Sequence, residues 1–135
     1  MDILVDSSAL MPVLLNEPEK GKIINLTKNC RLLAPSILPH EIGNALTRLR
    51  KRRLLSGEQV VAAYKDFRKI PLRLVDAEIE RALLLANKYS LYGYDACYLE
   101  IAGRLNLPLL TMDRTMKRAA TALKLRNLEK QDENI

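Results

Sequence analysis

Four acidic residues stand where the chain passes into an amphipathic helix, and together they could bind a metal ion. They are Asp6, Glu41, Asp95 and Asp113. Each also has a structural interpretation as a helix cap or first-turn acid, because a carboxylate stabilises the positive end of a helix. Two carboxylates about 4 Å apart repel by about 4 kcal/mol at an effective dielectric of about 20. Four converging carboxylates would therefore need a cation or raised pKa values.

Such a cluster would favour hard cations and phosphoryl-transfer chemistry. Oxygen ligands without neighbouring His or Cys side chains favour Mg²⁺ or Mn²⁺ over Zn²⁺. One or two such ions activate an attacking water and stabilise the leaving oxygen. The chain has a formal net charge of +6, which favours an anionic partner such as nucleic acid. An acidic metal site in a basic protein suits cleavage of a nucleic-acid backbone.

Asp6 and Asp113 each follow a short apolar run that is typical of a buried strand. These runs are residues 3–5 and 109–111. Ligands of open α/β sheets bind outside the carboxyl ends of the strands, so both acids stand where a functional acid would lie. For Asp6, taken alone, helix capping and function are equally favoured.

Glu41 lies on or beside the apolar stripe of a predicted helix. The stripe is formed by Leu38, Ile42, Ala45, Leu46 and Leu49. A carboxylate there is costly unless it is paired or bound to a metal, so we favour function over a first-turn role. Asn44 shares this face and could orient the carboxylate, whereas His40 is expected to face outward.

Asp95 opens a predicted helix that continues through Leu105, and it is either an N-cap or an acid that points inward. For Asp76, which ends the apolar run 72–74, we favour capping of the helix that follows. Ser36 or a neighbour is expected to cap the helix of Glu41. Ser56–Gln59 has the pattern of a capping box.

A basic run ends the helix of Glu41. It consists of Arg48, Arg50, Lys51, Arg52 and Arg53. Cations suit the C-terminal end of a helix dipole, so a solvated helix end is the favoured interpretation. A phosphate-binding patch is the alternative.

The predicted strands alternate with helices and imply a parallel three-layer α/β/α fold. The strands are expected at residues 3–5, 32–34, 72–74 and 109–111, with a possible short edge strand at 125–128 and the last helix over 114–125. Right-handed crossovers bring the carboxyl ends of parallel strands to one edge. Asp6 and Asp113 must then lie at that edge, and the helices of Glu41 and Asp95 can begin there.

Size and composition predict one globular domain. The chain has 135 residues, of which 48% are hydrophobic and 28% charged. We expect the domain to span residues 1–128 and the polar residues 129–135 to form a fraying tail. No apolar run approaches a membrane span and no signal peptide is recognisable, so we expect a cytoplasmic protein without membrane contact. Cys30 and Cys97 are isolated and predicted to be reduced, buried thiols.

In order and spacing, four segments resemble the motifs of PIN-domain ribonucleases, above all the small VapC-type toxins of prokaryotic toxin–antitoxin pairs. The segments are Leu4–Ser8, Glu41–Leu46, Tyr94–Tyr98 and Leu110–Asp113. The resemblance covers essentially the whole chain. It implies a parallel five-stranded sheet with helices on both faces and Mg²⁺- or Mn²⁺-dependent cleavage of RNA. It also implies a homodimer and inhibition by a VapB-type antitoxin.

Carried over by position, the resemblance also implies roles for individual residues. It makes Asp6, Glu41, Asp95 and Asp113 the metal-binding and catalytic acids, Ser7 and Thr111 supporting hydroxyls, and Asn44 an orienting amide. Some members of the family carry a further acid shortly after the position of Asp113. This chain has Thr115, Met116 and Lys117 there instead.

Two other functions compete with a nuclease. A catalytically silent PIN-like module would bind RNA or a protein partner without cleaving it, and the presence of all four acids argues against it. A phosphatase or phospho-acceptor domain would use an aspartate at a strand end. A haloacid-dehalogenase-type site needs a second Asp where Ser8 stands, and a receiver domain needs an acid where Val5 stands. No glycine-rich nucleotide-binding loop is recognisable either.

Overall fold

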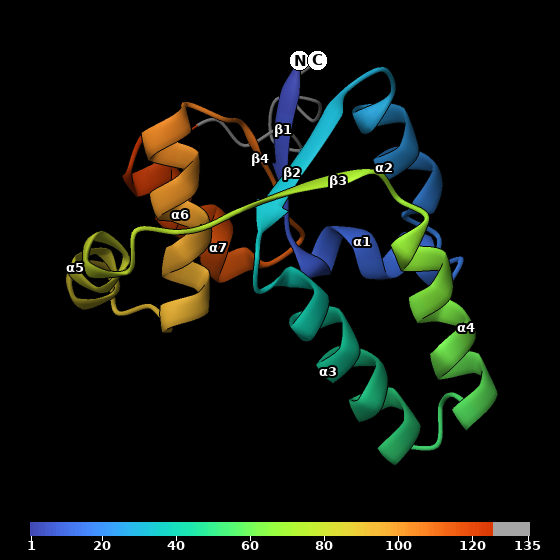
Figure 1. The fold of residues 1–135 in the computed structure, drawn as a ribbon. Coiled ribbons are helices and arrows are strands. Elements are labelled where there is room, and N and C mark those ends of the chain that lie inside the picture. The colour runs from blue at the N-terminus through green and yellow to red at the C-terminus, as the bar shows by residue number, and fades with distance from the viewer. Residues whose placement is uncertain (126–135) are drawn as a thin grey trace.

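The computed structural model describes residues 1–125, which form one parallel sheet between two layers of helices (Figure 1). The strands are β1 (Asp2–Val5), β2 (Arg31–Pro35), β3 (Leu72–Val75) and β4 (Leu109–Leu110). All strand pairs are parallel, which confirms the predicted fold class. The edge strand predicted at 125–128 and the predicted tail at 129–135 fall, apart from Leu125, outside the described residues.

Residues 1–125 contain seven helices, six between strands and one after β4. They are α1 (Ser7–Leu14), α2 (Lys20–Thr27), α3 (Leu38–Lys51), α4 (Gly57–Arg68), α5 (Ile79–Tyr89), α6 (Gly93–Leu105) and α7 (Arg114–Ala122). The last helix is shorter than predicted, because Leu123 is its C-cap and Lys124 adopts a left-handed backbone conformation with φ 58°. A helix cannot continue through that conformation.

Alternate side chains of β1 enter two different cores, as the pleat of a strand requires. Ile3 and Val5 pack on one face of the sheet with residues of α1, α2, α3 and α4. Leu4 packs on the other face with residues of α6 and α7, and α5 packs in turn against α6. This is the predicted three-layer arrangement, and β1 is buried on both of its faces.

The order of the strands in the sheet is β3-β2-β1-β4. The chain therefore moves outward from β1 to β2 and β3, and then crosses back to place β4 on the other side of β1. After β1 the chain enters α1 on one face of the sheet, and after β4 it enters α7 on the opposite face. The carboxyl ends of β1 and β4 thus flank the point at which strand order reverses, where open α/β sheets bind their ligands.

The structure confirms one predicted cap and corrects another. The Ser56–Gln59 capping box is formed, with reciprocal hydrogen bonds of 3.1 and 2.8 Å. The N-cap of α3 is Ile37, a neighbour of Ser36, and no side chain caps this helix. Asp76 does not cap α5, whose N-cap is Glu78. Instead the Ser36 hydroxyl donates to the Asp76 carboxylate at 2.5 Å. The two residues follow the adjacent strands β2 and β3, so their side chains meet at the same edge of the sheet.

Within the described part of the chain, no helix is long and apolar enough to cross a membrane. Cys30 and Cys97 are both free thiols, as predicted, although Cys30 is only half-buried.

Candidate active site at the carboxyl edge of the sheet

Asp6 lies directly after β1 at the reversal point and is only 4% exposed. Its Oδ1 accepts hydrogen bonds from the Ser8 hydroxyl at 2.7 Å and from the Ala9 amide at 3.1 Å. Its Oδ2 accepts from the Thr111 hydroxyl. The bond from Ala9 makes Asp6 the N-cap of α1. Capping and a place at the sheet edge are therefore compatible, and Asp6 has both.

The pKa of Asp6 is raised from 3.8 to about 6. Burial is the largest cause, because it disfavours the charged carboxylate. The hydrogen bonds from Thr111, Ser8 and Ala9 lower the pKa, and the charge of Asp113 raises it. The upward shift shows that the three donors do not fully replace the water that Asp6 has lost.

Asp113 repeats this arrangement on the neighbouring strand. Its carboxylate caps α7 by accepting from the Met116 amide at 2.9 Å. Its own amide donates to the Thr111 hydroxyl at 3.0 Å, and the Ser8 hydroxyl accepts from the Met112 amide at 2.8 Å. The two hydroxyls thus join the ends of β1 and β4 into one network around Asp6.

Glu41 lies in the first turn of α3 and is half-buried. Its Oε1 accepts a hydrogen bond from the Tyr98 hydroxyl of α6 at 2.7 Å. Burial raises the pKa of Glu41, the bond from Tyr98 lowers it, and the charges of Asp6 and Asp95 raise it further. Burial and the neighbouring carboxylates also raise the pKa of Tyr98, which keeps its hydroxyl a neutral donor that orients Glu41.

Asp95 lies in the first turn of α6 but does not cap it, because the N-cap is Tyr92. Within residues 1–125 the Asp95 carboxylate makes no hydrogen bond or ion pair. Burial raises the pKa of Asp95, and the charge of Asp113 raises it further. Of the two interpretations left open by the sequence, the N-cap is excluded.

The four acids are close enough to interact electrostatically, and the interacting pairs link them into a closed ring. Asp113 and Glu41 each interact with Asp6, and Asp95 interacts with both Glu41 and Asp113. We call this group the carboxylate ring. Among the described residues, no arginine forms an ion pair with any of the four. With the side chains in their present positions, no three or more His, Cys, Asp or Glu residues of the described part of the chain are grouped so that they could hold a metal ion.

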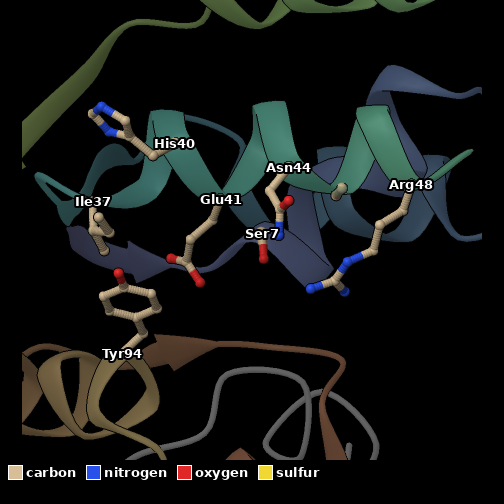
Figure 2. A pocket seen from close by; sticks show the side chains of 8 residues that line it. Ser7, Ile37, His40, Glu41, Asn44, Arg48 and Tyr94 are labelled. Atoms are coloured by element: carbon tan, nitrogen blue, oxygen red, sulfur yellow. The ribbon is translucent and has the colours of Figure 1, made fainter. Parts of the chain in front are cut away.

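A cleft of about 400 Å³ runs along α3 beside the ring (Figure 2). The residues that line it are Ser7, Ile37, His40, Glu41, Asn44, Ala45, Arg48 and Tyr94. The carboxylate of Glu41 and the guanidinium of Arg48 point to the same side of α3, whereas the imidazole of His40 points away (Figure 2). The cleft thus presents a carboxylate and a cation along one helix face.

Three predicted supporting residues differ in what they contact. Thr111 bonds Asp6 directly, whereas Ser7 and Asn44 line the cleft and make no hydrogen bond to a carboxylate among residues 1–125. Two supporting hydroxyls were not singled out from the sequence. Ser8 follows Asp6 by two residues, a spacing typical of local side-chain turns, and could have been found. Tyr98 bonds Glu41 across 57 positions, and only the tertiary fold reveals this contact.

The family model described as "PIN domain" matches residues 3–122 of this chain. Among curated proteins, the chain is 29% identical over 111 residues to the VapC ribonuclease Mb0985 of Mycobacterium bovis, covering 82% of this chain and 85% of the relative. The ribonuclease VapC9 of Mycobacterium tuberculosis matches with the same identity and coverage.

Solved structures with low sequence identity share the fold. The crystal structure of PAE2754 from Pyrobaculum aerophilum matches with a TM-score of 0.68 and 24% identity, over 97% of this chain and 95% of that one. The structure of Mycobacterium tuberculosis VapC20, a sarcin–ricin loop cleaving toxin, has a TM-score of 0.62 and 15% identity, over 87% and 94%. That of VapBC2 from Rickettsia felis, bound to a promoter DNA fragment, has a TM-score of 0.60 and 13% identity, over 88% and 93%.

Proposed function

The chain belongs to the PIN-domain family, and from this we propose that it is a Mg²⁺- or Mn²⁺-dependent endoribonuclease that hydrolyses RNA phosphodiester bonds. One observation carries the proposal: four carboxylates at the beginnings of four different helices lie close enough to interact electrostatically at the strand-order reversal. The ionised carboxylates of such a ring repel one another, and a bound divalent cation would offset this repulsion.

The donor set fits a hard divalent cation. Asp6, Glu41, Asp95 and Asp113 supply only carboxylate oxygens, the ligands that Mg²⁺ and Mn²⁺ prefer. When bound, such a cation would activate an attacking water and stabilise the leaving oxygen. Asp6, Glu41 and Asp113 already accept hydrogen bonds, so an ion would compete with those donors. Asp95 is the acid that has no such competitor among the described residues.

The chain's own residues would orient the site. Thr111 and Ser8 hold the Asp6 carboxylate from two sides, and Tyr98 holds Glu41. Ligands supported in this way keep their geometry without reorganisation during the reaction. The positive ends of α1, α3, α6 and α7 also face the acids that begin these helices, which lowers the cost of gathering the charges.

We further propose that the protein is the toxin of a toxin–antitoxin pair, that it forms a homodimer in the cytoplasm, and that a VapB-type antitoxin inhibits it. The curated relatives named as VapC ribonucleases support the toxin role. The solved VapBC2 assembly, a relative in fold, supports an antitoxin partner.

The test is cleavage of a labelled, mixed-sequence single-stranded RNA in Mg²⁺, in Mn²⁺ and in EDTA. We expect metal-dependent cutting by the wild type and a loss of at least about 100-fold in Asp95→Asn and Glu41→Gln, because residues that only orient metal ligands already contribute about 10–100-fold. Glu80→Gln, on the exposed side of α5, removes one carboxylate away from the ring and should cut normally.

Circular dichroism of each variant would confirm that the fold is intact. Full activity of a folded Asp95→Asn protein would exclude the carboxylate ring as the site. If the wild type binds RNA but cuts neither this substrate nor longer structured RNAs in any metal, the protein is a binding module instead.

A further inference from the structure

We propose that the basic end of α3 binds the phosphate backbone of the RNA strand beside the carboxylate ring, with Arg48 as the residue that positions the strand in the cleft. The basic end comprises Arg48, Arg50, Lys51, Arg52 and Arg53. This inference rests on the function proposed above, since it names where the substrate strand lies on one side of the reacting bond.

The first argument is position. Arg48 follows Glu41 by seven residues, or about two helical turns, so both lie on one face of α3. Both line the same cleft, and their charged groups point to the same side of the helix (Figure 2). A strand that fills the cleft with one phosphate at the carboxylate ring must therefore pass over Arg48.

The second argument is length. Seven residues of helix rise by about 10 Å, and a stacked nucleic-acid strand carries one phosphate per about 3.4 Å of its axis. Arg48 therefore lies within about three nucleotides of the phosphate at Glu41. The other four cations lie beyond Arg48, in the last turn of α3 and in the two residues that follow it.

The third argument is charge. All five cations are exposed, and none forms an ion pair or side-chain hydrogen bond within the described residues. Other basic side chains do have acidic partners, among them Arg31, Arg81 and Arg104. The helix dipole accounts for cations in the last turn, but it does not require one two turns from Glu41 inside the cleft. Unpaired cations in line with an acidic site suit a polyanion whose reacting phosphate lies at a metal.

The experiment measures binding of a fluorescent single-stranded RNA in EDTA, so that affinity is read without cleavage, across a range of salt concentrations. Each phosphate contact contributes about 0.7 to the slope of log affinity against log salt for single strands. We expect the magnitude of this slope to decrease by about 0.7 in Arg48→Gln and by about 1.4 in Lys51→Gln/Arg52→Gln. The matched control is Lys65→Gln/Arg68→Gln, which removes the same charge from exposed positions on the neighbouring helix α4.

The control should keep the wild-type slope. Equal slopes in the control and both test variants would overturn the proposal, and would leave an acidic protein segment as the ligand to test at this helix end. Cleavage by the same proteins in Mg²⁺ and Mn²⁺ is read separately. If the variants show the expected slopes but the wild type never cuts RNA, the proposed nuclease function is wrong and the RNA-binding role of the basic end stands. If the wild type cuts normally and the slopes are unchanged in the variants, the nuclease function stands and the RNA-binding role of the basic end is wrong.

Discussion

Asp6 illustrates how one carboxylate can serve as both a helix cap and a functional acid. It caps α1 with one oxygen and accepts from the Thr111 hydroxyl with the other. Yet its pKa stays raised, at about 6, because these donors do not compensate fully for burial. A purely structural cap would be expected to have a depressed pKa, since hydrogen bonds to the charged form stabilise it. The direction of the shift therefore means that burial of Asp6 outweighs the stabilisation that its three hydrogen-bond donors give to the charged form.

This shift predicts how the stability of the metal-free protein depends on pH. The folded-state pKa of Asp6 lies above the ordinary value of 3.8, so the folded protein binds this proton more tightly than the unfolded chain does. The contribution of Asp6 to the free energy of unfolding is then fully present below about pH 4 and is lost as the pH rises through about 6. The loss is about 3 kcal/mol at most.

Asp6→Asn tests this prediction, because an amide has no charge to bury. In EDTA, the free energy of unfolding measured by denaturant titration should fall for the wild type relative to Asp6→Asn between pH 4 and pH 7. At pH 7 the variant should be at least as stable as the wild type. A variant that is clearly less stable at pH 7 would mean that the carboxylate acts mainly as a structural cap.

At the scale of elements, α6 holds two parts of the site against the sheet. Its residues 96–102 are all buried, and it carries both Asp95 and Tyr98. One of those buried residues is the acid Glu100, which is 4% exposed. Glu100 accepts from the Arg104 guanidinium at 2.7 Å and from the Glu78 amide at 3.1 Å. The bond from Glu78, together with one from Arg104 to the Asp76 carbonyl at 2.9 Å, ties α6 to the segment that joins β3 to α5.

Glu100→Ala should destabilise this attachment. The substitution leaves the Glu78 amide without its acceptor and Arg104 without its closest partner. Loss of a hydrogen bond to a charged acceptor costs about 1.5–3 kcal/mol, and the pair with the exposed Arg104 adds little to this. Urea denaturation measures the change. Glu80→Ala on the exposed side of α5 is the control and should change stability by less than about 0.5 kcal/mol.

At the scale of the whole molecule, opposite charges are separated along α3. The chain as a whole is basic, with a net charge of +6, but the carboxylate ring at the sheet edge is acidic and the opposite end of α3 is basic. A divalent cation would neutralise the ring and reverse its repulsion of a phosphate. Metal binding should therefore affect both stability and affinity for RNA.

We expect Mg²⁺ or Mn²⁺ to raise the melting temperature of the wild type at pH 7. An ion at about 100 times its Kd stabilises the folded state by about 2.7 kcal/mol, or roughly 10 °C for a domain of this size. Differential scanning fluorimetry with and without EDTA measures the shift. In Asp95→Asn the shift should shrink markedly, and a shift that survives in this variant would place the ion elsewhere.

Much of this molecule could be predicted from local patterns in the sequence. The alternation of apolar runs and helical stripes predicted the parallel three-layer fold, and the Ser56–Gln59 pattern predicted a cap that the structure contains. The ordered motifs around the four acids predicted the family. Each of these features depends on residues close together in the chain, where hydrophobic periodicity and helix-capping residues can be recognised from the sequence.

Only the tertiary structure decided which side chains meet. The sequence favoured Asp76 as a cap, but register brings it against Ser36 from the adjacent strand. It assigned supporting roles to Ser7 and Asn44, whereas Ser8 and Tyr98 make the hydrogen bonds to Asp6 and Glu41. Strand order also put β4 next to β1 and so closed the ring of acids. These contacts join residues far apart in the chain, and they follow from packing and register, which no local pattern specifies.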